Sequence, residues 1–543
     1  MMNQSKKNSF VKQAGILAFA GIIVRMIGIL YRRPLTQLIG KEGIGYYSTA
    51  YNIYAIILLV SSYSIPAAIS KEIAKKLIAN EYKNAQRIFY CAIIYVILVG
   101  GVASLFTFFG ASVLVENNSI IVLRAFAPTV FLSGILGVFR GYFQAHRTMI
   151  QTSISQILEQ IFNAVVSVAA AYYMMRRLAL ADATTQRIYG AMGSAIGTGA
   201  GVLFALLFML MIYLLHQGSI QKRMQEDLNS QIQPYPEIFK IIFHMVTPII
   251  LSTFIYSLST SLNQTIYIKI LKYVKGLLEK DIIAQYGVFA GEVVIIVNIP
   301  IALAAAMSAA LLPSISGSFF LGHKKETNHK VDMAIRTTML IAIPAAVGFA
   351  VLARPVVQTL FPQKDTLMQA ASLLRCLSIT VIFYSLSTIT NGVLQGIGKV
   401  NIPVVNALIS LSIQTVVLVV TLLTTDWNLY ALTLVMIVYS FLMCILNGIS
   451  VYKYLGYRIN MKKTFVIPIA SSIVMGAVAY FSYRMSYTVC GINSISLLIS
   501  IVLAASSYFI LVIKVGGISE NEMKALPQGE KLAFWAKKMR VLS

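Results

Sequence analysis

The sequence predicts an all-α polytopic membrane protein, and three observations support that prediction. Of its 543 residues, 58% are hydrophobic and only 12% are charged, a balance typical of membrane proteins rather than soluble enzymes. Apolar runs of about twenty residues recur along the chain, each long enough to cross a hydrocarbon core of about 30 Å. Residue patterns also repeat between the two halves. We therefore expect about 14 transmembrane helices: two six-helix lobes in parallel repeat around a central cavity, plus two extra C-terminal helices.

The apolar runs place the expected spans in order along the chain. They lie at residues 13–32, 46–69, 88–112, 121–143, 150–175, 189–215, 241–268, 286–311, 334–353, 371–394, 402–423, 429–451, 464–484 and 492–513. We expect an N-terminal lobe over 1–216, a cytoplasmic linker over 217–240 and a C-terminal lobe over 241–452. The last two spans lie within 453–514, and a cytoplasmic tail follows at 515–543.

Lys and Arg residues indicate the orientation of the chain. The N-terminus, the even-numbered connections and the tail hold nearly twice as many of them as the odd-numbered connections do. Because cytoplasmic loops carry an excess of Lys and Arg, we expect a multi-pass protein of the cell membrane with both termini in the cytoplasm. The net charge of +25 is spread over short loops, so it suits membrane lipids and gives no basis for a nucleic-acid partner.

The first span carries an arginine in its middle. Its apolar run extends from Gln13 to Arg32, and small residues share one helical face with two arginines: Ala14, Ala18, Gly21, Arg25, Gly28 and Arg32. An arginine at mid-bilayer costs about 2.5–3.5 kcal/mol on insertion scales, so Arg25 needs a water-filled cavity or an anionic partner. The small residues leave room for either.

The sequence repeat joins the fourth and tenth spans. Residues Leu123, Arg124, Gly141 and Gln144 recur at the same spacing as Leu374, Arg375, Gly392 and Gln395. The halves then comprise spans 1–6 and 7–12, running in the same topological direction. Two parallel bundles that face each other across a midplane cavity form a transporter architecture.

Polar residues follow a helical face in several spans. Those of the fifth, seventh and tenth spans are Thr152, Gln156, Glu159 and Asn163; Ser252, Tyr256, Ser259 and Asn263; and Ser385, Thr388, Gly392 and Gln395. The second span adds Tyr47, Tyr51 and Tyr54. Unpaired polar groups are costly in hydrocarbon, so these faces must contact protein or water. They either hold helices together or line the cavity.

Two glutamates lie within apolar spans, Glu159 in the fifth and Glu292 in the eighth. Three interpretations remain open for them: a structural salt bridge to Arg25, an ion-coupling site for Na⁺ or H⁺, or a hydrogen-bonding role in packing. The series Gly193, Gly197 and Gly201 predicts close helix packing without chemistry.

The sequence contains no motif for catalysis, metal binding or nucleotide binding. The five histidines and four cysteines have no metal-ligand spacing, and no phosphate-binding loop, serine elbow or H-E-x-x-H pair is present. We therefore expect no catalytic residues, no metal and no cofactor. The energy for transport would then come from the membrane potential, Na⁺ or H⁺.

Three stretches resemble a known family. YSIPAAISKEIAKK at 63–76, GYFQAHRTMIQTSISQILEQI at 141–161 and NIPIALAAAMSAALLPSIS at 298–316, together with the span count and the duplication, are similar to the polysaccharide-transporter branch of the MOP flippase superfamily. Within it, the similarity is to the SpoVB/MurJ-like lipid II flippase group of Gram-positive bacteria.

The resemblance implies a flippase rather than an enzyme. Its substrate would be an undecaprenyl-diphosphate-linked saccharide, above all the peptidoglycan precursor lipid II, moved from the inner to the outer leaflet by alternating access. Membrane lipids and cell-wall synthesis proteins would be its partners. In the lipid II flippases, cavity arginines attract the diphosphate and the last two helices form a groove for the polyprenyl tail.

The resemblance also assigns roles to residues of this chain. Arg25 matches the first of the family's helix 1 arginines, and Arg32 is the nearest equivalent of the second. The family's arginines on helices 2 and 8 have no counterpart, since span 2 is uncharged and Val294 lies near the expected place in span 8. We expect Arg25 and Arg32 to bind the diphosphate. Polar residues of three spans would bind the saccharide: Gln156, Glu159, Asn163, Ser259, Asn263 and Gln395.

Three alternatives remain for the function. A MATE-like ion-coupled antiporter of organic cations shares the architecture, but its site should use acidic and aromatic residues without an arginine in the middle of the first helix. A saccharide polymerase or ligase needs a larger outer loop than 424–428 provides. The third alternative is a non-transporting membrane scaffold in cell-wall or spore-envelope assembly.

Overall fold

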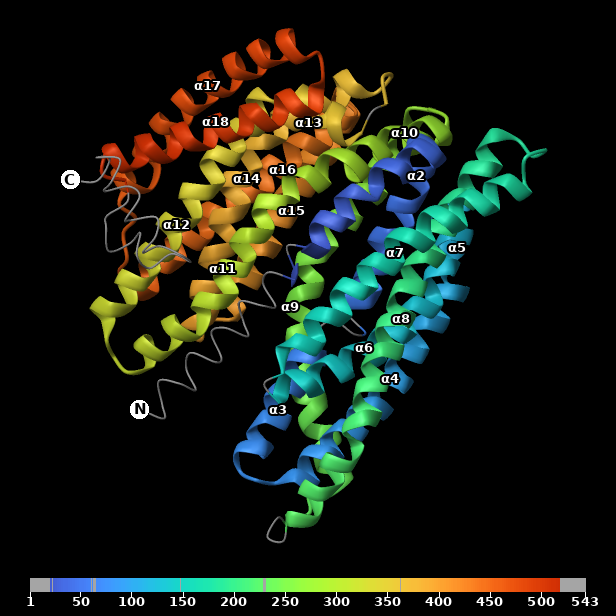
Figure 1. Ribbon diagram of the computed structural model, residues 1–543, viewed down its shortest axis with the longest axis vertical. Coiled ribbons are helices and arrows are strands. Elements are labelled where there is room, and N and C mark those ends of the chain that lie inside the picture. The colour runs from blue at the N-terminus through green and yellow to red at the C-terminus, as the bar shows by residue number, and fades with distance from the viewer. Residues whose placement is uncertain are drawn as a thin grey trace. The chain divides into compact units, whose positions relative to one another are not determined.

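The computed structural model describes residues 20–21, 23–59, 61, 65–146, 148–227, 231–361 and 363–517 (Figure 1). The chain divides into two compact units, Met1–Gly291 and Glu292–Ser543. Every regular element in the described ranges is a helix, which confirms the predicted all-α class.

In the described ranges, the first unit is built from nine α-helices after a helical segment at residues 20–21 and 23–30. Short 3₁₀ and π-helical turns, labelled η, lie between some of them. The elements are α2 (Arg32–Leu58), α3 (Ile65–Ile78), α4 (Tyr82–Phe109), α5 (Ala111–Leu114), η2 (Asn117–Ser119), α6 (Ile120–Ala145), α7 (Met149–Arg177), α8 (Ala183–Glu226), α9 (Tyr235–Lys269), η3 (Ile270–Val274) and α10 (Glu279–Val288).

The π-helical turn η4 (Phe289–Val293) contains the boundary between the units. The second unit then continues with α11 (Val294–Phe320), α12 (Lys324–Val351), α13 (Ala353–Leu360), α14 (Leu367–Gly396), α15 (Asn401–Thr424), α16 (Leu429–Leu455), η5 (Lys462–Val466), α17 (Ile467–Cys490) and α18 (Asn493–Lys514).

Eleven helices in the described part of the chain are long and apolar enough to cross a membrane. They coincide with eleven of the predicted spans. The other three predicted spans, at 13–32, 46–69 and 241–268, fall partly on residues or side chains outside the description. The count of about 14 therefore stays a prediction, whereas the multi-pass class is confirmed.

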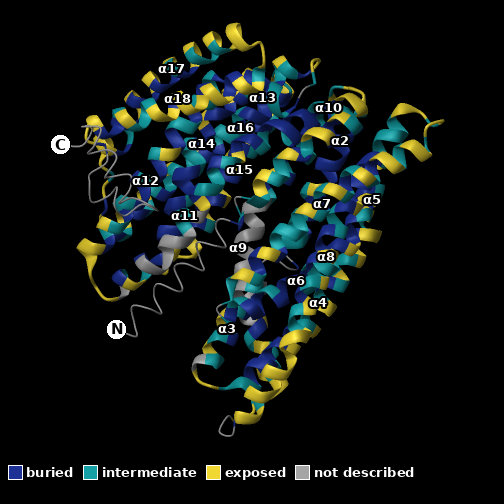
Figure 2. Ribbon diagram, viewed as in Figure 1, coloured by how far each residue is buried: buried dark blue, intermediate teal, exposed yellow. Residues whose placement is uncertain are grey.

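The surface of the helices agrees with a hydrocarbon environment. On α4, Leu98, Val102 and Leu105 are exposed by 62%, 68% and 59%, and exposed residues also follow α17 and α18 in the second unit (Figure 2). A row of large exposed apolar side chains would be costly in water, so these faces are suited to lipid.

The connection expected at 33–45 is helical instead. Residues 32–58 form α2, which is broken at Gly40, where φ is 69° and ψ is 177°. Only glycine adopts this backbone conformation without strain, so Gly40 lets the chain turn between two helical halves. The apolar runs could not reveal this short helix, because the stretch is too short and too polar to predict as a span.

Helix α8 reaches well beyond the predicted sixth span and takes up half of the segment expected to be a linker. After it ends at Glu226, the chain is tied to the start of α4. Asp227 accepts a hydrogen bond from the backbone N–H of Lys83, at 2.9 Å. Asn84 donates to the Gln231 carbonyl at 2.8 Å. These two hydrogen bonds attach the residues on either side of 228–230 to the start of α4.

The predicted duplication recurs in the contacts within each unit. Arg124 of α6 donates through Nε to the Phe108 carbonyl at the end of α4, at 3.2 Å. Arg375 of α14 donates through Nε to the Ala350 carbonyl near the end of α12, at 3.3 Å. In both units the same arginine of the repeat satisfies a C-terminal carbonyl of the preceding long helix, where a cation is favoured. The two halves therefore share local structure as well as residues.

The predicted glycine packing is confirmed between α7 and α8. A Cβ atom on Gly193 would lie 2.6 Å from the Ala171 nitrogen, one on Gly197 would lie 2.3 Å from the Ser167 nitrogen, and one on Gly201 would lie 2.4 Å from the Glu159 carbonyl oxygen. No side chain fits at such distances, so the glycines allow the two backbones to touch.

This packing predicts the effect of adding one methyl group. We expect Gly197→Ala to destabilise the protein by about 1–3 kcal/mol, since the neighbouring backbone cannot move aside at small cost. Thermal unfolding of the purified protein in detergent measures the change. Gly101→Ala in α4 is the matched control, because a Cβ there meets nothing within 4 Å. Equal melting temperatures for the two variants would contradict the prediction.

The last two helices, α17 and α18, pack against other helices of the second unit. Tyr508 of α18 donates to the Leu340 carbonyl of α12 at 2.9 Å. Asn493 at the start of α18 donates to the Pro355 carbonyl and to Thr359 of α13, at 3.0 and 2.8 Å. These contacts fix α18 beside α12 and α13, and α17 is joined to α18 by a hydrogen bond from Ser500 to the Ala479 carbonyl, at 2.7 Å. The groove for a lipid tail that was expected at 453–514 stays a prediction, and the tail beyond residue 517 lies outside the described residues.

Candidate functional site

Arg32 is the first residue of α2, and the contacts of its guanidinium make it the main cation of the predicted site. Its guanidinium lies 5.6 Å from the centre of the Tyr47 ring, and Nη1 makes a long contact of 3.5 Å with the Gly291 carbonyl. No carboxylate in the described ranges forms an ion pair with it. Most of its five N–H donors are therefore available to a ligand. A half-buried guanidinium without an acidic neighbour is a ready anion-binding group.

An aromatic cluster adjoins Arg32. It consists of Tyr47, Tyr51, Tyr54 and Phe126, with Tyr47 and Tyr51 stacked at 5.7 Å and Tyr54 and Phe126 stacked at 4.5 Å between ring centres. Tyr47 and Tyr54 are buried, whereas Tyr51 is 37% exposed. The predicted tyrosine stripe of the second span is therefore packed against α6, and Tyr51 is its most exposed member.

Arg25 lies in the helical segment before α2 and is exposed. The small-residue face around it is confirmed in part. A Cβ on Gly28 would lie 3.1 Å from Nε2 of Gln160 in α7, whereas a Cβ on Gly21 would meet nothing within 4 Å. The segment thus touches α7 at one glycine and leaves open space at the other, as the small residues predict.

Glu159 pairs with Arg140, an arginine that the sequence analysis missed. Nη2 of Arg140 lies 2.7 Å from Oε2 of Glu159, and Nε of Arg140 donates to Ser155 at 2.9 Å. Arg140 lies near the end of α6 and inside the predicted span 121–143, but sequence reasoning assigned it to the following connection and counted only Arg25, Glu159 and Glu292 as intramembrane charges. A salt bridge to Glu159 was foreseen as an alternative, but with Arg25 as its partner.

Asn163 has a packing role between α7 and α8. Its side chain is buried, and its Oδ1 accepts hydrogen bonds from Ser167 at 2.8 Å and Thr198 at 3.4 Å. Thr198 also contacts the Tyr47 hydroxyl at 3.3 Å, so this network supports the aromatic cluster. Gln156, on the same predicted stripe, is half-buried.

Ser259 and Asn263 are buried in α9, as their predicted stripe requires. Gln264, the residue after Asn263, takes part in a hydrogen-bond network that sequence reasoning passed over. Gln264 accepts from Nδ2 of Asn52 at 2.6 Å, and the same nitrogen donates to the Tyr286 hydroxyl at 2.8 Å. Asn52 therefore joins α2, α9 and α10. Because Asn52 lies off the tyrosine stripe, helical periodicity gave no reason to single it out.

The remaining predicted site residues belong to the second unit. Glu292 lies in the π-helical turn η4 and is 1% exposed. Gln395 is exposed near the end of α14. Its stripe neighbours Ser385 and Gly392 are buried, and a Cβ on Gly392 would overlap with Ser308 of α11. This stripe therefore mostly packs helices together. No metal-binding cluster occurs in the part of the chain that the structure describes.

A second group of charges within the first unit ties the start of α10 to η3 and to the connection before η2. Lys272 lies 2.7 Å from Glu116 and 2.8 Å from Glu279. Burial lowers the pKa of Lys272, but the hydrogen bonds and charges of the two carboxylates outweigh it and raise that pKa above its ordinary value. Lys272 is therefore charged at any physiological pH, and it holds three separate segments together.

Comparisons with known proteins agree with this architecture. The chain matches the family described as "Polysaccharide biosynthesis protein" over residues 10–319 and the MatE family over residues 261–421. It is 24% identical to "Lipid II flippase MurJ" of Bacillus subtilis (strain 168), covering 87% of this chain and 88% of the relative. It is 23% identical to "Stage V sporulation protein B" of the same organism, covering 96% and 98%.

Solved structures share the fold. A multidrug resistance MATE family transporter of the MOP superfamily, in an inward-facing conformation, aligns with a TM-score of 0.64 at 15% identity, over 82% of this chain and 98% of that one. Lipid II flippase MurJ in an inward closed conformation aligns with a TM-score of 0.61 at 14% identity, over 91% and 97%. These proteins are flippases and transporters, as the sequence predicts. The chain therefore belongs to the polysaccharide biosynthesis protein family and has the fold of the MOP superfamily.

Proposed function

We propose that this protein is a flippase that moves an undecaprenyl-diphosphate-linked saccharide, most simply lipid II, from the inner to the outer leaflet by alternating access. One observation carries the proposal. Arg32 has no carboxylate partner in the described ranges, and it lies beside an aromatic cluster at the start of α2. The guanidinium suits the diphosphate, and the exposed ring of Tyr51 suits the apolar face of a sugar.

The roles of the other predicted residues follow from their contacts. Arg25 is exposed and would extend the cationic surface along the first helix toward the diphosphate. Gln156, half-buried on α7, and Gln395, exposed on α14, would hydrogen-bond the saccharide. Glu159 and Asn163 would act indirectly, because their oxygens already accept hydrogen bonds from Arg140 and from Ser167 and Thr198.

A direct test uses the purified full-length protein in proteoliposomes. Fluorescent lipid II is placed in both leaflets, and the fraction that a membrane-impermeant quencher reaches is followed over time. We expect lipid II to equilibrate across the bilayer only when the protein is present. A protein that moves organic cations but leaves lipid II in place would instead be an antiporter, the function that the MatE match over residues 261–421 would favour. A protein that moves neither would be a scaffold.

The membrane potential gives a direction to transport. A diphosphate with two negative charges that leaves an inside-negative compartment gains about 4.6 kcal/mol per 100 mV, before any co-transported ion is counted. We therefore expect net export of lipid II from vesicles to rise when a potassium gradient with valinomycin makes the interior negative. Equal net export at zero and negative potential would contradict an electrogenic step.

Glu292 is the remaining candidate for coupling to Na⁺ or H⁺, since Glu159 is held by Arg140. A carboxyl that is 1% exposed in a π-helical turn has the burial that a coupling site needs. If Glu292 binds the coupling ion, Glu292→Gln will flip lipid II at a rate that no longer responds to either ion gradient. An unchanged response in that variant would exclude it.

A further inference from the structure

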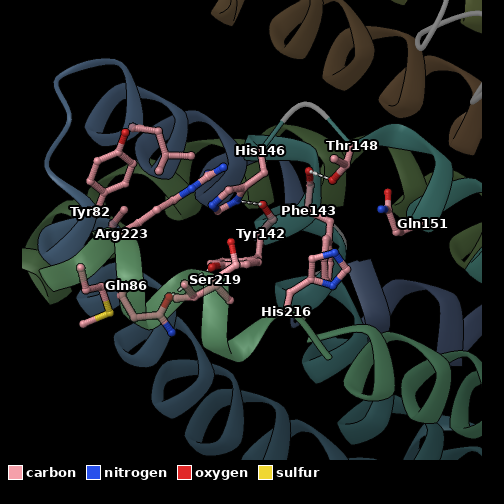
Figure 3. Close-up of a pocket in the computed structure, with 14 residues that line it drawn as sticks. Tyr82, Gln86, Tyr142, Phe143, His146, Thr148, Gln151, His216, Ser219 and Arg223 are labelled. Atoms are coloured by element: carbon pink, nitrogen blue, oxygen red, sulfur yellow. Dashed lines mark hydrogen bonds between the residues drawn. The ribbon is translucent and has the colours of Figure 1, made fainter. Parts of the chain in front are cut away.

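A cavity of about 190 Å³ lies at the end of the first unit that is predicted to be cytoplasmic. We call it the inner pocket. It is formed by the end of α3, the start of α4, the end of α6, the start of α7 and the long extension of α8 (Figure 3). Liquid water occupies about 30 Å³ per molecule, so the inner pocket has room for a small polyatomic ion with several waters. It is separate from Arg32 and the aromatic cluster.

The charged groups of the inner pocket are all basic. Its titratable or charged lining residues are Tyr82 from α4, Tyr142 and His146 from α6 and its end, and His216 and Arg223 from α8. No carboxylate lines it, and Arg223 forms no ion pair with any residue of the described ranges. Figure 3 shows Arg223 extending toward His146. A cavity with one permanent cation, two imidazoles and no acid favours an anion.

Both imidazoles have one ring nitrogen occupied and one available. Nδ1 of His146 lies 2.9 Å from the Tyr142 carbonyl, and Nδ1 of His216 lies 2.8 Å from the Ile212 carbonyl. A carbonyl oxygen only accepts, so each Nδ1 carries the proton and donates it. Each Nε2 is then an acceptor in the neutral ring and becomes a donor when the ring is protonated. An anion near Nε2 would favour that protonation.

The wall of the inner pocket is fixed by other hydrogen bonds. Gln86 donates to the Tyr213 hydroxyl at 2.6 Å and accepts from the Tyr142 hydroxyl at 3.2 Å, so it is fully used in packing. Gln151 is different, because its Oε1 is buried without a hydrogen-bond partner in the described part of the chain. An acceptor in this position suits a ligand that also carries a hydroxyl or a proton, as a phosphate does.

We propose that the inner pocket binds a phosphate group, with Arg223 as the fixed cation and His146 as the group that takes up a proton on binding. The same chemistry is presented by inorganic phosphate and by the headgroup of an anionic phospholipid. The proposal does not depend on the flippase function, since it concerns a different site of the first unit.

The direction of the pH effect follows from the surroundings of His146. Burial lowers the pKa of its imidazole, the hydrogen bond to the Tyr142 carbonyl raises it, and the nearby charge of Arg223 lowers it, with a net decrease. The empty pocket therefore holds a neutral His146 at pH 7. A bound phosphate supplies a close negative charge that raises this pKa. The complex binds more protons than the empty pocket, so phosphate affinity increases as the pH falls through the range between the two pKa values.

The test measures the pKa of each histidine in the full-length protein. The chain has only five histidines, so ¹³C-labelled histidine resonances can be assigned by single His→Asn variants. Nanodiscs of phosphatidylcholine are titrated without phosphate, with saturating inorganic phosphate, and with half of the lipid replaced by phosphatidylglycerol. We expect the pKa of His146 to rise by about one pH unit when the pocket is filled. His323, in the second unit, reports any general effect of surface charge.

Each result of the titration either identifies the ligand or overturns the proposal. A rise with inorganic phosphate alone identifies a free anion as the ligand, and a rise with phosphatidylglycerol alone identifies the lipid headgroup. A rise with both supports a pocket that accepts either. Arg223→Gln should abolish the rise, whereas Arg177→Gln, which removes an exposed cation from the end of α7, should leave it intact. No rise in either condition, a rise equal to that of His323, or a rise that persists in Arg223→Gln would overturn the proposal.

Discussion

Replacing Arg32 with glutamine is expected to lower the initial rate of lipid II flipping in proteoliposomes by about 10- to 100-fold. A hydrogen bond to a charged group contributes about 1.5–3 kcal/mol, and Gln keeps a polar side chain of similar reach without the charge or the fork of donors. Arg32→Lys keeps the charge but not the bidentate geometry, so an intermediate rate is expected. The measurement is the initial rate at equal protein abundance in the vesicles.

The Arg32 prediction has a control in the same unit. Arg177 stacks on Tyr173 with its guanidinium 4.7 Å from the ring centre, but it is exposed at the end of α7. Arg177→Gln therefore removes an exposed cation–π contact on a different helix, and this variant should flip lipid II at the normal rate. If both glutamine variants slow flipping equally, the effect comes from general surface charge, and Arg32 does not bind the diphosphate specifically.

The structure changes the relative weight of the two arginines predicted from the first span. Sequence reasoning favoured Arg25, because a charge in the middle of an apolar run is conspicuous. Arg32 lies at the junction of the first span and α2, where an arginine is ordinary by composition alone. The structure adds what composition could not show, because Tyr47 of the same helix and the distant Gly291 contact Arg32 without neutralising its charge.

Features set by local spacing were predictable. The glycines of α8 recur every four residues and pack closely against another helix, as predicted, and the arginines of the repeat make equivalent contacts in both units. Features that depend on where a long side chain extends could not be predicted from the sequence. Arg140 meets Glu159 across the turn between α6 and α7, and the same spacing would equally allow Arg140 to extend toward the headgroups. The break at Gly40 was also hidden, because glycine alone does not indicate a positive φ.

The contact between Arg140 and Glu159 leads to a prediction about whether Glu159 serves packing or ion coupling. The two side chains are 16% and 31% exposed, so the pair is only partly screened by solvent. Glu159→Gln leaves Arg140 without its carboxylate and should destabilise the protein by about 1–2 kcal/mol, less than for a fully buried pair. Arg140→Gln should cost a similar amount.

The double variant Arg140→Gln/Glu159→Gln decides between the two roles. A paired carboxylate predicts that the double variant is about as stable as either single one, so the coupling in a double-mutant cycle of thermal unfolding equals the cost of one single variant, about 1–2 kcal/mol. It also predicts that Glu159→Gln protein, where it remains folded, responds to Na⁺ and H⁺ gradients as the unaltered protein does. Additive losses in the cycle, combined with loss of that response, would make Glu159 the coupling residue. Because the geometry already gives its Oε2 a guanidinium partner at 2.7 Å, we expect coupling in the cycle and an unchanged response.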